Sequence, residues 1–255
     1  HAVIEYKNHS LLFVYIPEQN DKPVYLRGKD LFCSYHRSAG QTVKMSRNQV
    51  KALIANSQGI TFEQQLAKNN LSKNEVLRFL NYKALYQLLD KNIPQSIDSI
   101  IARLTDYHLC KQDGPYWAIT NLGAILFANK LSEFPNMPGH EVIVRKYVGI
   151  NNRQQEFEQH GFYGYAVGFE GLIDFIMNNT STEQIDIKRE AIPTYPRVAI
   201  REFVANALVH QDFAITGMPV TIEIFANRLT ITNAGAPLND INRLIDLPPQ
   251  SRNEQ

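Results

Sequence analysis

Cysteine, tryptophan and excess charge of either sign are scarce in this chain of 255 residues. It contains 2 cysteines and 1 tryptophan, and its formal net charge at pH 7 is +1. Cys33 and Cys110 lie far apart with no C-x-x-C spacing, which excludes a zinc ligand set and a disulfide framework and fits a reducing cytoplasm. The near-zero net charge excludes a basic field over the whole molecule, so contact with nucleic acid would need a local basic patch.

Long apolar runs and several familiar catalytic motifs are absent from the sequence as well. No run of about 18 apolar residues exists, so we expect no membrane span. The sequence contains no G-x-x-x-x-G-K-[ST], no G-x-S-x-G and no H-E-x-x-H. These absences exclude a P-loop helicase motor, a serine-hydrolase elbow and a zincin site.

The most informative segment is 201–210, which reads REFVANALVH. Glu202 and Asn206 are four residues apart, which places a carboxylate and an amide one turn apart on the same helix face. Together they can hold a hydrated Mg²⁺ and orient a water at a phosphate, since Mg²⁺ prefers oxygen ligands and keeps several waters. The alternative, which so short a pattern leaves open, is a solvated Glu–Asn pair. A second face carries the apolar residues on which we expect the helix to pack: Ile200, Phe203, Val204, Ala207 and Leu208.

A hairpin and a glycine turn follow this helix. Apolar and polar residues alternate over 219–225 and again over 229–232, and Ala226-Asn227-Arg228 between them is typical of a tight turn. The hairpin runs directly into Asn233-Ala234-Gly235. Glycine adopts backbone conformations that other residues avoid and lets a ligand approach the chain, so we expect a binding turn at Gly235.

This order of helix, hairpin and glycine turn resembles the Bergerat (GHKL) ATP-binding fold of gyrase, histidine kinases and MutL. The strings RE…HQDF, NRL, NAG and the final SRN at 251–253 are similar to the RecG-related branch of that family. The resemblance implies that Glu202 polarises a water, Asn206 holds Mg²⁺, and Asn233 with Gly235 holds the adenine of ATP. His210 would line the nucleotide pocket. Its alternative role is to interact favourably with the C-terminal end of the helix dipole.

The sequence departs from the family pattern at several positions. Asn233 stands where the family usually has aspartate, so the acceptor for the adenine amino group is uncharged. Ala236 replaces the second glycine of the turn, and Gln211 replaces the arginine of the branch. The later glycine-rich box that wraps the phosphates is not in the sequence. We therefore expect the chain to come from a longer protein and, by itself, to bind ATP weakly or not at all.

The N-terminal region resembles a second family. The strings KPVYLRG at 22–28 and RSAGQT at 37–42 are similar to the C-terminal half of the Schlafen-type AlbA domain, once labelled a divergent AAA ATPase. The resemblance implies a module that binds nucleic acid. Basic side chains next to aromatic ones suit phosphate contact and base stacking, and the alternative is an ordinary solvated β surface. The basic candidates, interleaved with Tyr25, Phe32 and Tyr35, are Arg27, Lys29, Arg37 and Lys44.

The middle of the chain predicts a helical connector. Ser72 and Glu75 form a capping box that opens a helix, whose apolar stripe we extend to Leu89. A second amphipathic helix is expected over 97–109, then a short strand and a further helix over 121–128. These elements are compatible with a winged-helix unit, but they carry no basic recognition face, which favours a packing module between domains.

We therefore predict an α+β protein with three parts. Residues 1–58 form half of an AlbA-like β/α domain, 59–135 the helical connector, and 136–255 an incomplete Bergerat-type α/β two-layer sandwich. The predicted function is that of an ATP-responsive DNA-binding protein, a transcriptional regulator of the cytoplasm with ATP and Mg²⁺ as cofactors. Whether it also hydrolyses ATP stays open. The alternative is a non-enzymatic DNA-binding or scaffold protein whose Bergerat-like fold is vestigial and serves packing or homo-oligomer formation.

Overall fold

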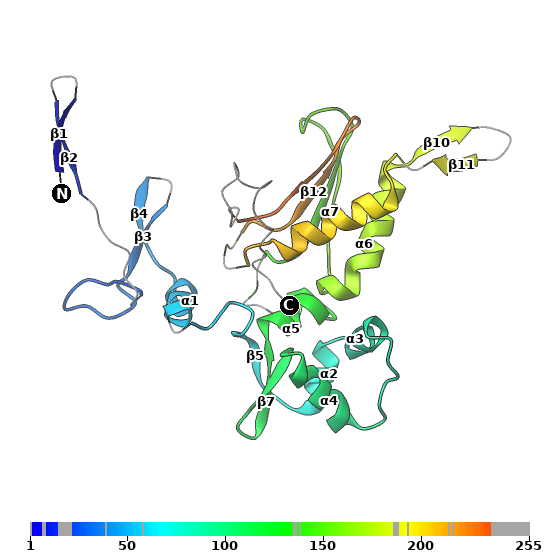
Figure 1. The fold of residues 1–255 in the computed structure, drawn as a ribbon, viewed down its shortest axis with the longest axis horizontal. Helices are drawn as coiled ribbons and strands as arrows, with labels where there is room; N and C mark the ends of the chain where they lie inside the picture. Colours follow the sequence, from blue (N-terminus) through cyan, green and yellow to red (C-terminus); the bar gives the residue numbers. More distant parts are fainter. Residues whose placement is uncertain are drawn as a thin grey trace, which may run out of the picture. The chain divides into compact units, whose positions relative to one another are not determined.

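The computed structural model of this chain combines helices with several separate sheets, which confirms the predicted α+β class (Figure 1). The chain divides into two compact units, His1–Thr61 and Phe62–Gln255. Within the part of the chain that the structure describes, no helix is both long enough and apolar enough to cross a membrane. The described residues are 2–6, 9–14, 22–38, 40–57, 59–134, 137, 139–185, 189–192, 194–213, 215 and 217–235.

The described part of unit 1 contains two hairpins and a helix. The first hairpin is β1 (Ala2–Tyr6) with β2 (His9–Phe13), and the second is β3 (Tyr35–Ser38) with β4 (Gln41–Lys44). Ser46 caps the helix that follows the second hairpin. Its hydroxyl accepts a hydrogen bond from the Gln49 backbone N–H at 3.3 Å, and α1 (Arg47–Ser57) begins there.

The first half of unit 2 is a small sheet with helices packed on it. The sheet has the antiparallel strand order β5-β7-β6, and α2, α4 and α5 contact it. Such a three-stranded sheet with short helices is compatible with the winged-helix arrangement considered above. The elements are β5 (Leu66–Leu71), α2 (Lys73–Phe79), α3 (Tyr82–Leu88), α4 (Ile97–Asp106), β6 (Cys110–Asp113), β7 (Tyr116–Thr120), α5 (Asn121–Phe127) and the 3-10 turn Leu131–Glu133.

The single helix predicted from Ser72 to Leu89 is wrong. The capping box at its start is present, with the Glu75 carboxylate accepting from the Ser72 backbone N–H at 2.8 Å. The helix stops at Phe79, because Leu80 is extended and bridges to Ala128, and the Asn81 N–H donates to the Phe127 carbonyl at 2.7 Å. The Asn81 side chain then caps α3. Tertiary pairing with α5 therefore interrupts a continuous apolar stripe.

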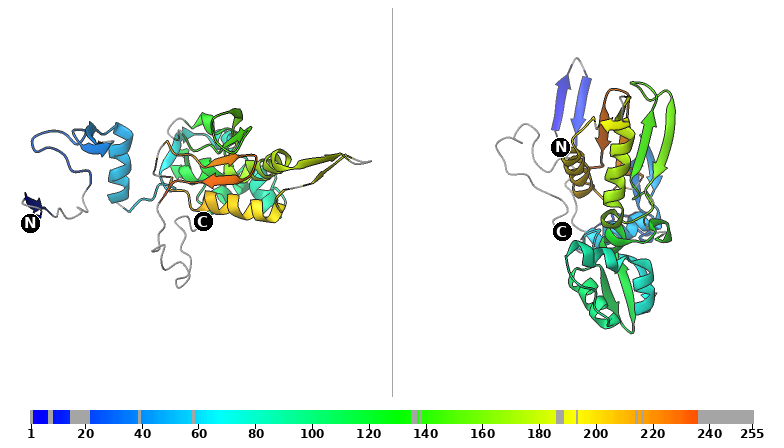
Figure 2. Two further views of the ribbon diagram at one scale, coloured as in Figure 1. Left: turned by 90° about the horizontal axis from the view of Figure 1, so that it is seen from above. Right: turned by 90° about the vertical axis from the view of Figure 1, so that its right-hand side faces the viewer.

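The second half of unit 2 is a four-stranded sheet with two helices on one face. The strand order is β13-β12-β8-β9, and the central pair β8 and β12 is parallel. Helices α6 and α7 lie side by side over this sheet (Figures 1 and 2). The elements are β8 (Ile143–Tyr147), β9 (Gln155–His160), α6 (Tyr165–Thr180), the hairpin β10 (Thr182–Ile185) with β11 (Arg189–Ile192), α7 (Arg197–Val209), β12 (Thr221–Ile224) and β13 (Leu229–Thr232).

One hydrophobic core runs through both halves of unit 2. It joins Phe79 and Phe134 in the first half to Ile173, Val204 and Ile222 in the second. Helix α5 contacts α6, which connects the two halves directly. The predicted domain boundary between 135 and 136 therefore lies within unit 2, whose core includes residues from both sides of it.

Candidate functional site

Helix α7 carries the motif identified in the sequence and packs as its apolar spacing predicts. Pro196 precedes its first turn, and His210 caps its end, with the His210 backbone N–H bonded to the Asn206 carbonyl at 2.9 Å. The inner face is formed by Ile200, Val204, Ala207 and Leu208, all buried. Phe203 departs from the prediction. It is 64% exposed, because its side chain lies at a cavity rather than in the core.

The hairpin after α7 also follows the predicted alternation. Its strands pair in register, with Ile222 opposite Ile231 and Ile224 opposite Leu229. Ile222 and Ile224 are buried, and Ile231 is partly buried against the same core. The hairpin therefore forms a wall that faces α7.

A cavity of about 420 Å³ lies between α7 and this hairpin. It brings together three of the predicted site residues from three different elements. Asn206 comes from α7, His210 from the end of that helix, and Asn233 from the residue that follows β13. Apolar side chains make up most of the remaining lining: Tyr195, Ala199, Ile200, Phe203, Ala207, Leu229 and Ile231.

The other two predicted residues adjoin this cavity without lining it. The Glu202 carboxylate accepts a hydrogen bond from the Asn206 side-chain amide at 3.2 Å, and both side chains are exposed. Gly235 is two residues beyond Asn233 and has a φ of 125°, in the region that favours glycine. The expected glycine turn is therefore present. The departure at Ala236 and the SRN string at 251–253 lie outside the described residues.

Gln211 holds the glycine turn against the end of α7, a role that sequence reasoning missed. Its side chain is buried, its Oε1 accepts from the Ala234 backbone N–H at 2.8 Å, and its Nε2 donates to the Met218 carbonyl at 3.0 Å. The Asp212 N–H donates in turn to the Ala234 carbonyl at 2.9 Å. The buried side-chain amide of Gln211 bonds to backbone groups of two separate segments and so fixes the distance between them. No pattern in the local sequence predicts this contact.

The orientation of Asn233 sets the polarity of the cavity. Its Nδ2 donates to the His210 carbonyl at 3.1 Å. This bond leaves the side-chain oxygen of Asn233 to accept a hydrogen bond from a ligand. The backbone of His210 is the C-cap of α7 and accepts the hydrogen bond from Asn233, and the residue also lines the cavity.

The fit of Mg²⁺ rests on Asn206 and Glu202. Among the residues that the structure describes, no group of three or more His, Cys, Asp and Glu side chains gathers to hold a metal ion by itself. Mg²⁺ bound with a nucleotide needs only one or two protein oxygens, because phosphates and waters complete its shell. The Asn206 side-chain oxygen fits that limited requirement, because the nitrogen of the same amide is the group that faces Glu202.

The basic candidates of unit 1 separate into two groups. Arg37 and Lys44 share one face of the β3–β4 hairpin, because Tyr35 pairs with Lys44 and Arg37 with Thr42. All four of these side chains are exposed. Arg27 and Lys29 are also exposed but lie on a turn outside this hairpin, closed by a bond from the Lys29 N–H to the Leu26 carbonyl at 3.0 Å. Phe32, one of the interleaved aromatics, is stacked by the Arg47 guanidinium instead.

No known protein family matches this sequence, and no curated protein matches it. A distant structural match is the DIP2311 protein from Corynebacterium diphtheriae, with 12% sequence identity and a TM-score of 0.45. The match covers 80% of this chain and 39% of that chain, so this chain spans less than half the length of that protein.

Proposed function

We propose that the cavity between α7 and the β12–β13 hairpin binds the adenine nucleotide of an ATP-responsive DNA-binding protein, a transcriptional regulator. The observation that carries the proposal is the convergence of Asn206, His210 and Asn233 on one cavity of about 420 Å³. That volume falls in the range of small-molecule sites, which are apolar clefts with a few placed polar groups.

The lining suits a purine base. Ile200, Ala207 and Leu229 offer apolar surface for the faces of the ring. The free oxygen of Asn233 accepts a hydrogen bond from the exocyclic amino group of adenine. Guanine presents a carbonyl at the same place, which would oppose that oxygen. The site should therefore prefer adenine over guanine nucleotides.

Asn206 and Glu202 would take the phosphate end. With Mg²⁺ bound, the ion neutralises phosphate charge, and the Asn206 oxygen is the group that would hold it. Glu202 accepts a hydrogen bond from the Asn206 amide, which aims the oxygen of that amide away from the carboxylate. An exposed carboxylate in this position can also accept a hydrogen bond from a water and polarise it.

The DNA-binding surface of the proposal is the exposed face of the β3–β4 hairpin. Arg37 and Lys44 supply charge for phosphates, and Tyr35 between them supplies a ring for stacking. The Arg37 guanidinium donates to the Thr42 hydroxyl at 3.0 Å, which holds it on this face.

A second candidate is the scaffold function, in which the cavity is vestigial and α7 serves homo-oligomer formation. The observation that favours it is apolar exposure on α7 itself. Val198 is 78% exposed and Phe203 is 64% exposed, although exposed charged residues also lie on this helix. Exposed apolar side chains on one helix are suited to an interface.

Nucleotide binding separates the two candidates. Saturation-transfer difference NMR with Mg-ATP and Mg-GTP detects weak ligands, and we expect a stronger signal for ATP. Asn233→Leu removes the acceptor and should abolish that preference. The matched control Asn69→Leu changes an exposed asparagine of β5 and should leave it intact. Equal signals for ATP and GTP that are insensitive to Asn233 would reject the nucleotide function and leave the scaffold function.

A further inference from the structure

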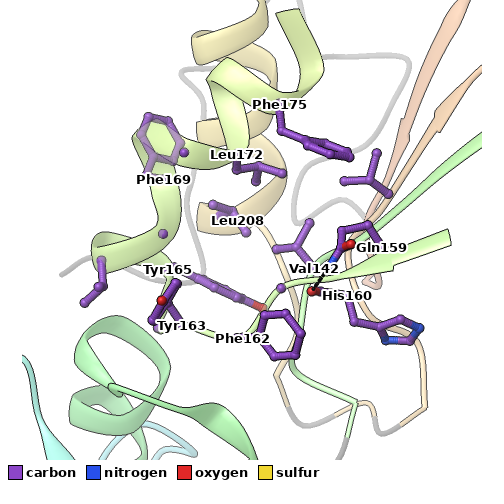
Figure 3. Close-up of a pocket in the computed structure, with 16 residues that line it drawn as sticks. Val142, Gln159, His160, Phe162, Tyr163, Tyr165, Phe169, Leu172, Phe175 and Leu208 are labelled. Atoms are coloured by element: carbon purple, nitrogen blue, oxygen red, sulfur yellow. Dashed lines mark hydrogen bonds between the residues drawn. The ribbon is translucent and has the colours of Figure 1, made fainter. Parts of the chain in front are cut away.

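A second cavity lies between α6 and the strands β8 and β9 (Figure 3). Its volume is about 430 Å³, and the loop 161–164 closes one end. Helix α7 contributes Leu208 to this cavity. It contributes Ala207 to the cavity proposed for the nucleotide, between α7 and the β12–β13 hairpin, so the two cavities are separate spaces that both border α7. The lining side chains that Figure 3 labels are Val142, Gln159, His160, Phe162, Tyr163, Tyr165, Phe169, Leu172, Phe175 and Leu208.

Two glycines of α6 line this cavity. Gly168 and Gly171 lie on the same strip of the helix as Leu172 and Phe175, at spacings of three and four residues. Each glycine inside a helix costs about 1 kcal/mol relative to alanine. Neither has a left-handed φ. A Cβ at Gly171 would meet nothing within 4 Å, and one at Gly168 would make only an ordinary contact with Tyr163 at 3.4 Å.

Gly164, by contrast, is a glycine that close packing requires. A Cβ at Gly164 would lie 2.6 Å from the backbone of Leu126 and Ala128, so that glycine is needed for close approach. Backbone conformation and packing do not require glycine at position 171. Gly171 is exposed and lines the cavity, so a side chain at this position would occupy space at the cavity.

The chemistry of the lining points to an uncharged ligand. The Tyr165 hydroxyl is occupied, since it donates to the His140 carbonyl at 2.8 Å. His160 is paired with Glu158 at 2.9 Å and with Glu141 at 3.5 Å, and none of the described residues that line the cavity is an Asp, Glu, Lys or Arg that could pair with a charged ligand. Gln159 donates its Nε2 to the His160 carbonyl at 3.0 Å, which leaves its Oε1 as an acceptor at the cavity.

Aromatic side chains lie on the loop 161–164 at one end of the cavity. Phe162 is 64% exposed and Tyr163 is 54% exposed, on the loop that closes the cavity. Phe175 is already edge-on to Phe157, and Phe169 lies under the Arg201 guanidinium. The exposed rings of Phe162 and Tyr163 are therefore the ones that can contact another ring. The strip without side chains at Gly168 and Gly171 suits a flat body.

We infer that this cavity is a second ligand site, and that it takes a neutral, flat aromatic molecule with a single hydrogen-bond donor. The donor would bond to Gln159, and the ring system would lie against the glycine strip of α6. The inference is independent of nucleotide binding, because no residue lines both cavities.

A pair of fluorescent probes tests the site on the intact chain. N-phenyl-1-naphthylamine is neutral and carries one N–H donor, and 1-anilinonaphthalene-8-sulfonate has the same ring skeleton with an added sulfonate. We expect saturable, one-to-one enhancement of fluorescence with the neutral probe and at least tenfold weaker binding of the sulfonate. Addition of the neutral probe should shift the methyl NMR signals of Leu172 and Leu208, which line the cavity.

Variants that fill the space provide the control. Gly171→Leu places a side chain at the cavity and should weaken binding of the neutral probe at least tenfold. The unfolding temperature should stay equal or rise, because a glycine inside a helix is removed. Ala102→Leu adds the same side chain to an exposed position of α4 and should change neither property. Absent or non-saturable binding, equal binding of the sulfonate, unshifted Leu172 and Leu208 methyls, or full binding by a folded Gly171→Leu protein would each overturn the inference.

Discussion

At the scale of single residues, the candidate nucleotide site depends on a buried amide that does not touch the ligand. Gln211 bonds to the Ala234 N–H and the Met218 carbonyl, and it thereby fixes the turn that presents Asn233. The predicted site residues are exposed or partly exposed, so their positions depend on such buried contacts. Gln211 is a positioning residue for this reason.

Replacement of Gln211 should therefore affect stability and the turn together. Gln211→Met keeps the length of the side chain but leaves the buried Ala234 N–H without its acceptor, which costs about 1–3 kcal/mol. Urea unfolding measures this destabilisation, and hydrogen exchange of the Ala234 amide should accelerate. Gln87→Met, at an exposed position of α3, is the control. Unchanged exchange at Ala234 in Gln211→Met would contradict the role.

His160 offers a test of electrostatics at the same scale. The hydrogen bond to Glu158, with a further one to Glu141, raises the pKa of His160 above its ordinary value. Folding therefore favours the protonated ring. Its stabilising contribution is full below the unfolded pKa and is lost as the pH rises through the folded pKa.

Removal of the main partner should reverse the shift. In Glu158→Gln the pKa of His160, followed by NMR titration of its ring protons, should fall towards the ordinary value. Glu156→Gln changes another carboxylate of β9, which pairs with Lys146, and it should leave the His160 titration unchanged. A His160 titration that is the same in both variants would show that the Glu158 contact is not formed in solution.

At the scale of elements, features set by local sequence signals could be predicted, whereas features set by tertiary contacts could not. The capping box at Ser72 and the alternation of the β12–β13 hairpin are short-range patterns, and both are confirmed. The break at Leu80 is not visible in the sequence, because it is imposed by pairing with α5. The exposure of Phe203 is similar, since its spacing is that of a core residue while its surroundings are those of a cavity.

The two serine caps of unit 2 make a matched pair. At α2 the Ser72 hydroxyl accepts from the Glu75 N–H, whereas Ser96 at α4 makes no side-chain capping bond. Ser72→Ala should lower the free energy of unfolding by about 1 kcal/mol. Ser96→Ala should cost much less, and chemical denaturation of the two variants compares them. Equal destabilisation in the two variants would mean that α2 does not depend on its capping box.

At the scale of the whole molecule, charge is balanced and the proposed DNA contact is local. Arg37 and Lys44 lie on one hairpin face of unit 1. Removal of one side chain that neutralises a phosphate should reduce the slope of log affinity against log salt by about one. The double variant Arg37→Ala with Lys44→Ala should weaken binding to unrelated DNA sequences alike and reduce that slope by about two.

Two comparisons control this experiment. Lys83→Ala with Lys91→Ala removes the same charge from exposed positions of unit 2, and Glu202→Ala alters only the candidate nucleotide site. Both should bind DNA as the unaltered chain does in the absence of ATP. If the Arg37→Ala, Lys44→Ala variant binds DNA with an unchanged salt slope, this hairpin face is ordinary solvated surface and does not bind DNA.

The sequence predicted the class of the fold, α7 and its hairpin, and three residues that converge on one cavity. It did not predict the hydrogen bonds of Gln211 or the cavity between α6, β8 and β9, because each depends on segments that meet only in the folded chain. Gly168 and Gly171 carry a sequence signal that could have been recognised. Two glycines inside one helix are unfavourable for the helix, which distinguishes these positions in the sequence.

The most direct test of the account is to map Mg-ATP on the chain by NMR. The proposed function predicts that added Mg-ATP shifts the side-chain amide signals of Asn206 and Asn233 and the ring signals of His210, with smaller shifts for Mg-GTP. Signals of the Leu172 methyls in the second cavity should move little. Absence of shifts at Asn206, His210 and Asn233 at millimolar Mg-ATP, or shifts confined to other surfaces, would contradict the claim that this cavity is a nucleotide site.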